Sequence, residues 1–191
     1  TVLIRGEPGI GKSAIVAELT RAATRQGIGS HTLQVLDFGQ VAVERPMPAL
    51  ALGLLGAGTD GSTDDRADAV TRAAARGLIA PEDVLLAGDM VDAAIADDGR
   101  ACLAAMDSHA RERGRARLLH RLLQQAAVQP LLLVIEDVHW ASTHEIAQLA
   151  ELAASAAARP VLICLTSRPG DDALAAAWRA RGSGSPLTTL D

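Results

Sequence analysis

Short apolar runs rich in β-branched residues alternate along the chain with longer segments in which apolar residues recur at helical spacing. Such runs predict strands with few polar positions, as expected for strands buried on both faces of a sheet. The alternation of strands with helices favours a parallel sheet with helices on both faces, so the predicted fold class is α/β. The predicted strands are residues 1–5, 33–37, 131–137, 161–166 and, more weakly, 187–191.

Two segments beside the predicted strands have clear helical patterns. Residues 12–25 follow the first strand, and residues 115–128 place their apolar side chains on one face before the third strand. A further helix is expected after the third strand, with Ser142 or Thr143 as its cap. The Gly- and Ser-rich stretch 181–186 predicts a loop.

Residues 48–128 form an insertion between the second and third predicted strands, and it is far longer than an ordinary connection. Ala-rich segments at 66–76 and 81–96 predict helices within it, and the Gly-rich residues 56–62 predict a break. We therefore expect residues 1–191 to form a single domain with a helical insertion. Because the chain starts within a strand-like run and not with Met, we expect it to be a piece of a longer protein.

The residues after the first strand carry the strongest functional signal. The stretch Gly6-Glu-Pro-Gly-Ile-Gly-Lys-Ser13 fits G-x-x-x-x-G-K-[ST] between a strand and a helix, as a phosphate-binding loop requires. Its backbone N–H groups and the positive end of the following helix favour phosphate. Lys12, the only lysine among 18 Lys and Arg residues, offers a compact charge to the β- and γ-phosphates, and Ser13 a hydroxyl to Mg²⁺. The predicted nucleotide-binding residues are Gly6, Glu7, Pro8, Gly9, Ile10, Gly11, Lys12, Ser13 and Ala14.

Glu136 and Asp137 end the buried strand 131–137, at the edge of an open α/β sheet where ligands bind. One such acid can hold Mg²⁺, and the other can orient or deprotonate an attacking water. Because adjacent strand residues point to opposite sides, we assign Glu136 to the metal and Asp137 to the water, while the reverse assignment stays open. The alternative is that one carboxylate only caps the next helix or pairs with an arginine.

The strand 161–166 also ends in polar residues. Thr166, Ser167 and Arg168 could reach the γ-phosphate, and Arg168 is the favoured sensor because a guanidinium binds phosphate oxygens bidentately. The alternative is that Arg168 pairs with a surface acid. His139 could lie near the nucleotide, although His139 and Trp140 are more simply explained as residues that wedge the turn after Asp137.

In the motifs GEPGIGKS, LLLVIEDVHWAS and LICLTSRPG, and in their order and spacing, the chain resembles the AAA-like ATPase module of the STAND class of signal-transduction P-loop NTPases. Within that class it is similar to the modules of large LuxR-type bacterial transcriptional regulators and of nucleotide-cyclase-linked proteins. The resemblance implies a five-stranded parallel sheet, with the strand 161–166 between strands 1–5 and 131–137. It also implies ATP with Mg²⁺, slow hydrolysis, and an ADP-closed to ATP-open switch that governs assembly of the full protein.

Two departures from the family pattern limit what the resemblance implies. Glu136 stands where other P-loop enzymes have a metal-binding Asp, and Asp137 stands where typical relatives have a catalytic Glu, so feeble hydrolysis is expected. The small domain that follows the ATPase core in that class is not included in this chain. An interaction scaffold that binds nucleotide without useful hydrolysis is therefore an alternative, and so is a DNA-handling ATPase of the origin-recognition or loader type.

Composition and charge narrow these alternatives. The net charge of −5 argues against a broad nucleic-acid-binding face, and the two cysteines have no metal-ligand spacing. No apolar run approaches the length of about 18 residues that would span a bilayer, and we expect a cytoplasmic protein without a membrane partner. A cluster of arginines is expected to be a solvated helix face and not a DNA site: Arg111, Arg113, Arg115, Arg117 and Arg121.

Overall fold

The computed structural model describes residues 1–35, 46–58, 60–170, 172–181 and 186–191. The chain falls into two compact units. The sheet unit comprises Thr1–Pro46 and Ala126–Asp191, and the helical unit comprises Met47–Gln125. The helical unit covers nearly the same residues as the insertion expected at 48–128.

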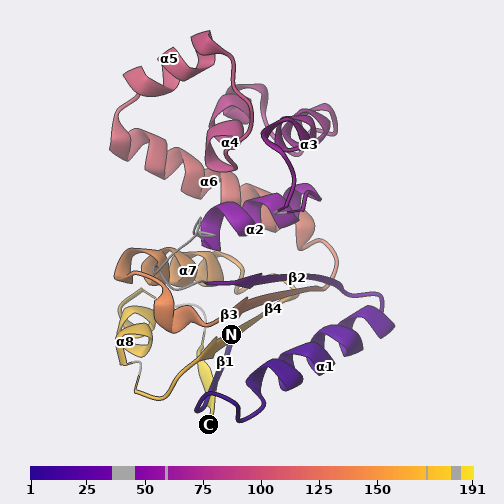
Figure 1. Ribbon diagram of the computed structural model, residues 1–191, viewed down its shortest axis with the longest axis vertical. Coiled ribbons are helices and arrows are strands. Elements are labelled where there is room, and N and C mark those ends of the chain that lie inside the picture. Colours follow the sequence, from indigo (N-terminus) through magenta and orange to yellow (C-terminus); the bar gives the residue numbers. More distant parts are fainter. Residues whose placement is uncertain (36–45, 59, 171, 182–185) are drawn as a thin grey trace. The chain divides into compact units, whose positions relative to one another are not determined.

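The sheet unit is built on five parallel strands in the order β2-β3-β4-β1-β5. β4 lies between β1 and β3, as the family resemblance implies, so the carboxyl ends of these three strands meet at one edge of the sheet. The predicted α/β fold with a five-stranded parallel sheet and flanking helices is confirmed (Figure 1). The strands are β1 Val2–Arg5, β2 Gly29–Gln34, β3 Leu131–Glu136, β4 Val161–Ser167 and β5 Thr188–Leu190.

Helices cover both faces of this sheet. Figure 1 shows α1 (Lys12–Arg25) on one side of the strands, and α7 (Thr143–Ser155) with α8 (Asp172–Arg181) on the other. Ser142 caps α7 as predicted, because its hydroxyl accepts the backbone N–H of Glu145 while the Glu145 carboxylate accepts the N–H of Ser142. The core beneath α1 consists of buried residues from the helix and three strands: Ile4, Val16, Ala23, Leu132, Val134 and Cys164.

The position of β2 corrects the sequence prediction. A strand was expected at 33–37, but β2 spans Gly29–Gln34, and the end of the predicted range lies outside the described residues. β2 is an edge strand in which only Leu33 is buried, so it lacks the continuous apolar run of a central strand. Its register comes from pairing with β3, which sets Gly29 opposite Leu131 and Gln34 opposite Glu136.

The helical unit confirms that the insertion is folded as helices, with different boundaries from those expected. The segment expected as one helix over 81–96 forms a short 3-10 turn (Pro81–Asp83) and α4, which ends at Met90. Asp92 then adopts a left-handed backbone (φ 51), which no helix can continue through. No helix among the described residues has the length and apolar character to cross a membrane. The helices of this unit are α2 Pro46–Leu55, α3 Thr63–Ala75, α4 Val84–Met90, α5 Asp97–Ala105 and α6 Ser108–Ala126.

Of the five arginines of α6, Arg113, Arg117 and Arg121 are exposed, as the sequence predicted, whereas Arg111 and Arg115 are half-buried. Arg115 pairs with Asp89 of α4, with 3.1 Å between Nε and Oδ2, and Arg121 donates to Asp83 at 2.8 Å. Arg111 donates to the backbone carbonyl of Leu103. The helix also begins at Ser108, earlier than the predicted start at 115, so these side chains reach partners on neighbouring segments of the same unit.

Candidate functional site

The loop between β1 and α1 has the backbone that its glycines predict. β1 ends at Arg5 and α1 begins at Lys12. Gly9 has a φ of 83° and Gly11, the residue before the helix, has a φ of 112°. Side chains with a Cβ avoid such angles, so glycine is required for this path. The path turns the chain sharply from the edge of the sheet into the first turn of α1.

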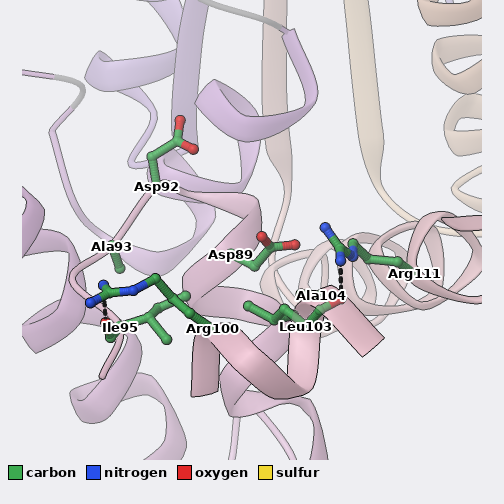
Figure 2. A pocket seen from close by; sticks show the side chains of 8 residues that line it. All are labelled: Asp89, Asp92, Ala93, Ile95, Arg100, Leu103, Ala104 and Arg111. Carbon is green, nitrogen blue, oxygen red and sulfur yellow. Dashed lines mark hydrogen bonds between the residues drawn. The ribbon is translucent and has the colours of Figure 1, made fainter. Parts of the chain in front are cut away.

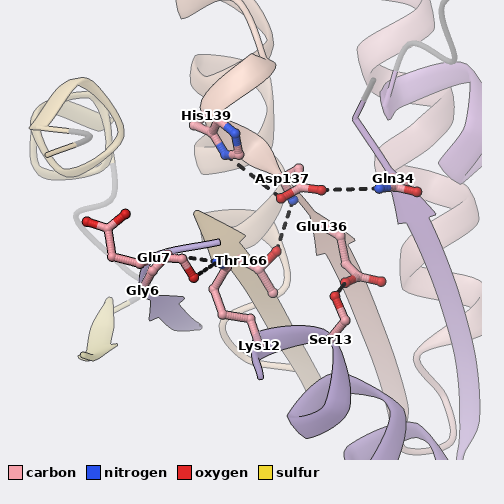
Figure 3. A network of polar contacts seen from close by, with 9 residues as sticks. All are labelled: Gly6, Glu7, Lys12, Ser13, Gln34, Glu136, Asp137, His139 and Thr166. Atoms are coloured by element: carbon pink, nitrogen blue, oxygen red, sulfur yellow. Dashed lines mark hydrogen bonds and ion pairs between the residues drawn. The ribbon is translucent and has the colours of Figure 1, made fainter. Parts of the chain in front are cut away.

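Lys12 folds back over this loop. Its Nζ donates to the carbonyl oxygen of Gly6 at 2.7 Å and to that of Glu7 at 3.1 Å (Figure 3). The first turn of α1 contains no acidic residue, and no side chain caps the helix. The positive end of the helix dipole and the lysine charge therefore meet at the same loop, which makes it suitable for an anion such as phosphate.

Ser13 and Glu136 are brought together from opposite parts of the chain. The Ser13 hydroxyl donates to Glu136 Oε2 at 3.0 Å, from the first turn of α1 to the end of β3 (Figure 3). A hydroxyl and a carboxylate are oxygen ligands of the kind that Mg²⁺ prefers, so these two residues fit a magnesium ion that takes its remaining ligands from phosphate and water. The described residues contain no group of three or more His, Cys, Asp and Glu side chains that could hold a metal without such help.

Asp137 corrects one step of the sequence argument. β3 ends at Glu136, and Asp137 leaves the strand with a left-handed backbone (φ 59, ψ 40). The two acids therefore point in different directions because the backbone turns at Asp137, and not because side chains alternate along a strand. The Asp137 N–H donates to Thr166 Oγ1 at 2.9 Å, which ties the turn to the buried end of β4.

Gln34 is a site residue that the sequence analysis missed. Its side-chain Nε2 donates to Asp137 Oδ2 at 3.1 Å from the end of the neighbouring strand β2 (Figure 3). A polar residue at the carboxyl end of the strand beside β3 could have indicated Gln34, because the carboxyl ends of adjacent parallel strands share one edge of a sheet. Gln34 was missed because the predicted strand at 33–37 placed it near the start of β2, whereas it lies at the end of that strand.

The residues after Asp137 form a short turn, Val138–Trp140. His139 Nδ1 lies 4.0 Å from Asp137 Oδ1, and the His139 and Trp140 rings are 4.9 Å apart. The Arg168 guanidinium lies over the Trp140 ring, 5.1 Å from its centre, in a cation–π contact. Trp140 thus packs against both neighbours, while the expected contact of Arg168 with a γ-phosphate stays a prediction.

Two groups on strands of the sheet have pKa values shifted from their usual range. Burial raises the pKa of the Cys164 thiol to about 11, and the charge of nearby Glu136 adds to the rise. Burial also lowers the pKa of His31 on β2. At neutral pH Cys164 is therefore a protonated, weakly reactive thiol, and His31 is a neutral imidazole.

Comparison with known families agrees with this geometry. The family model described as AAA ATPase domain matches residues 1–164, which include the phosphate loop, Glu136 and Asp137 but end before Arg168. A search of curated proteins finds no match. The chain belongs to the AAA ATPase domain family, which implies nucleotide binding and hydrolysis.

Proposed function

We propose that this chain is a cytoplasmic regulatory ATPase module that binds Mg·ATP, hydrolyses it slowly, and serves as a switch within a multidomain bacterial signalling or transcriptional regulator. The observation that carries the proposal is the convergence of the phosphate loop, Ser13, Glu136 and Asp137 at one edge of the sheet (Figure 3). The motif resemblance to STAND-class modules supports the switching role. In that role the partners would be other domains of the same protein and further copies of it, without direct contact to nucleic acid.

Each residue at this edge has a role that its contacts support. Lys12 would exchange its two carbonyl partners for β- and γ-phosphate oxygens. Ser13 and Glu136 would hold Mg²⁺, which supplies charge neutralisation on the phosphates when bound. We assign the metal to Glu136 and not to Asp137, because Glu136 is the acid in contact with Ser13.

Asp137 would act on the attacking water. The water oxygen forms a bond to the γ-phosphorus, the bond from that phosphorus to the β-phosphate oxygen breaks, and Asp137 takes the water proton. Thr166 and Gln34 hold the backbone and carboxylate of Asp137 in place for this step. Slow turnover is expected because an aspartate reaches one methylene less far than a glutamate and already accepts a hydrogen bond from Gln34.

A scaffold without useful hydrolysis is the second candidate. It is favoured by the same Gln34 contact, since one oxygen of the proposed base is occupied and the other lies 4.0 Å from His139. In this alternative the site would bind nucleotide and change its contacts without cleaving the phosphate bond.

A single-turnover measurement separates the two. Excess protein is mixed with trace labelled Mg·ATP, and ADP is followed in parallel with the Lys12→Ala variant and with the Arg21→Ala variant, which removes an exposed cation from the same helix. We expect ADP to form in the parent and in Arg21→Ala, but not in Lys12→Ala. Binding without ADP formation would favour the scaffold, and no binding would reject both.

A further inference from the structure

Arg168 follows directly after β4, at the edge of the sheet where the phosphate loop begins. Ser167, the last residue of β4, lies opposite Arg5 of β1, and its carbonyl oxygen accepts the N–H of Gly6 at 3.3 Å. The backbone of Arg168 is therefore one residue away from a hydrogen bond to the first residue of the loop. Its long side chain starts beside the loop over which Lys12 folds.

The guanidinium of Arg168 lies on an aromatic ring and not on an acid. It is 5.1 Å from the centre of the Trp140 ring. Within the described part of the chain it makes no ion pair and no hydrogen bond, so the alternative that Arg168 pairs with a surface acid is not observed there. The hydrogen-bond donors of this exposed guanidinium are therefore available for a ligand.

Guanidinium groups of the helical unit are held more firmly. Figure 2 shows Arg100 and Arg111, whose side chains donate to the backbone carbonyl oxygens of Ile95 and Leu103. A cation–π contact at an exposed site is weaker than a charge-assisted hydrogen bond. Arg168 can therefore leave its aromatic partner for phosphate oxygens, because the contact that it gives up is weaker than the contacts that it gains.

The Trp140 ring is held by contacts that do not involve Arg168. The Trp140 N–H donates to the carbonyl oxygen of Asp137 at 3.0 Å, and the His139 ring packs against the indole with 4.9 Å between their centres. The Asp137 N–H in turn donates to Thr166 of β4 at 2.9 Å. Movement of the guanidinium therefore does not require the ring to move.

We propose that Trp140 is a positioning residue that holds Arg168 away from the phosphates, and that a bound nucleoside triphosphate draws the guanidinium from the ring to its γ-phosphate. This inference rests on the proposed function, because it requires Mg·ATP at the phosphate loop. A nucleoside diphosphate has no γ-phosphate and leaves Arg168 on the ring. The third phosphate is thus detected at the same turn that holds Asp137.

Calorimetry with Mg·ADP and with Mg·ATPγS, a slowly hydrolysed analogue of ATP, tests the competition between the two positions of Arg168. A cation–π contact at an exposed site corresponds to a change in affinity of about 2- to 5-fold. Trp140→Leu should therefore tighten Mg·ATPγS binding by about that factor and leave Mg·ADP binding unchanged. Trp140→Phe, which keeps a weaker aromatic face, should have a smaller effect.

The Arg168→Ala background shows whether this effect passes through the guanidinium. In that background, Trp140→Leu should change neither affinity. If Trp140→Leu weakened Mg·ATPγS binding, or if its effect were the same with and without Arg168, the ring would have a packing role only and the proposal would be wrong.

Tryptophan fluorescence gives a second measurement, because the chain contains only two tryptophans, Trp140 and the buried Trp178. Mg·ATPγS should shift the emission of the parent and of Arg159→Ala, which removes an exposed arginine before the start of β4, whereas Mg·ADP should not. The shift should be absent in Trp140→Phe and in Arg168→Ala.

The outcomes separate this inference from the proposed function. If both nucleotides bound to the parent but gave equal shifts or none, or if the shift persisted in Arg168→Ala, the inference would be overturned and the proposed function would stand. If calorimetry showed that neither nucleotide binds to the parent, both would be overturned.

Discussion

The candidate site of the sheet unit and the helical unit use charged residues in opposite ways. In the helical unit, Asp83 and Asp89 pair with arginines of α6, so the charges hold helices together. At the edge of the sheet, Lys12 contacts carbonyl oxygens, Glu136 contacts a hydroxyl and Asp137 contacts an amide. A charge that is paired with an opposite charge produces little net electrostatic potential at a ligand. A charge that is held only by dipoles still produces most of its potential there.

The difference has a structural origin. Parallel strands end together, so the turns after β1, β3 and β4 present their polar groups at one edge without the need for mutual pairing. Helices of the second unit instead meet along their sides, where an unpaired half-buried charge would be costly.

The largest effect is expected at the phosphate loop. Lys12→Ala removes a cation proposed to make two charge-assisted hydrogen bonds of about 2 kcal/mol each, so Mg·ATP should bind about 10³-fold more weakly. Calorimetry at fixed salt measures the affinity, with Arg21→Ala as the control. If the affinity of Lys12→Ala for Mg·ATP were unchanged, the loop would not be the phosphate-binding site.

Asp137→Asn should preserve nucleotide affinity and slow phosphate release about 10²-fold, because the amide cannot take a proton from water. Single-turnover rates of the variant and the parent measure this effect, and Asp68→Asn serves as a control for loss of a surface carboxylate. Comparable rates in Asp137→Asn and the parent would move the water-activating role to another residue.

Breaking a charge pair in the helical unit should reduce stability and not activity. Asp89→Asn leaves the guanidinium of Arg115, 32% exposed, without its carboxylate, and we expect a loss of about 1–3 kcal/mol in the free energy of unfolding. Hydrogen exchange resolved by segment should show faster exchange in α4 and α6. A larger effect on Mg·ATP affinity than on this exchange would contradict the division of roles between the units.

Each unit also contains a helix with a complete capping box, which allows a matched comparison. Ser62 caps α3 with Asp65, and Ser142 caps α7 with Glu145. Replacement of either serine by alanine should cost about 1 kcal/mol and should increase exchange in the first turn of its own helix. If each serine variant increased hydrogen exchange equally in α3 and in α7, the caps would not act locally.

The smallest effect concerns pH. The hydrogen bond and charge of Arg5 hold the pKa of Asp191 below its ordinary value, with 2.7 Å between Arg5 Nε and Asp191 Oδ1. The contribution of this pair to stability is therefore complete above the unfolded pKa and is lost as pH falls through the lower, folded pKa. Asp191→Asn should slightly lower the urea midpoint of unfolding at neutral pH. It should also make the decrease of that midpoint at acidic pH smaller than in the parent, whereas Asp68→Asn should change neither quantity.

Local patterns in the sequence were sufficient to predict much of the secondary structure and of the candidate site. The glycine spacing and Lys12 predicted the loop, the apolar run ending at Glu136 predicted a central strand, and Ser142 predicted the start of α7. Each of these depends on residues within a few positions of one another, where spacing alone decides backbone angles and burial. The edge strand β2 was misplaced because its one buried residue, Leu33, leaves too little periodicity to set its register.

Sequence alone determined the fold class, the phosphate loop and the pair of acids at the end of β3. Only the tertiary structure joined Ser13 to Glu136, 123 positions apart, and Gln34 to Asp137, 103 positions apart. It also paired Asp89 with Arg115. Those contacts depend on strand order, on register and on the packing of helices, which arise from the whole chain and leave no local periodicity from which they could be predicted.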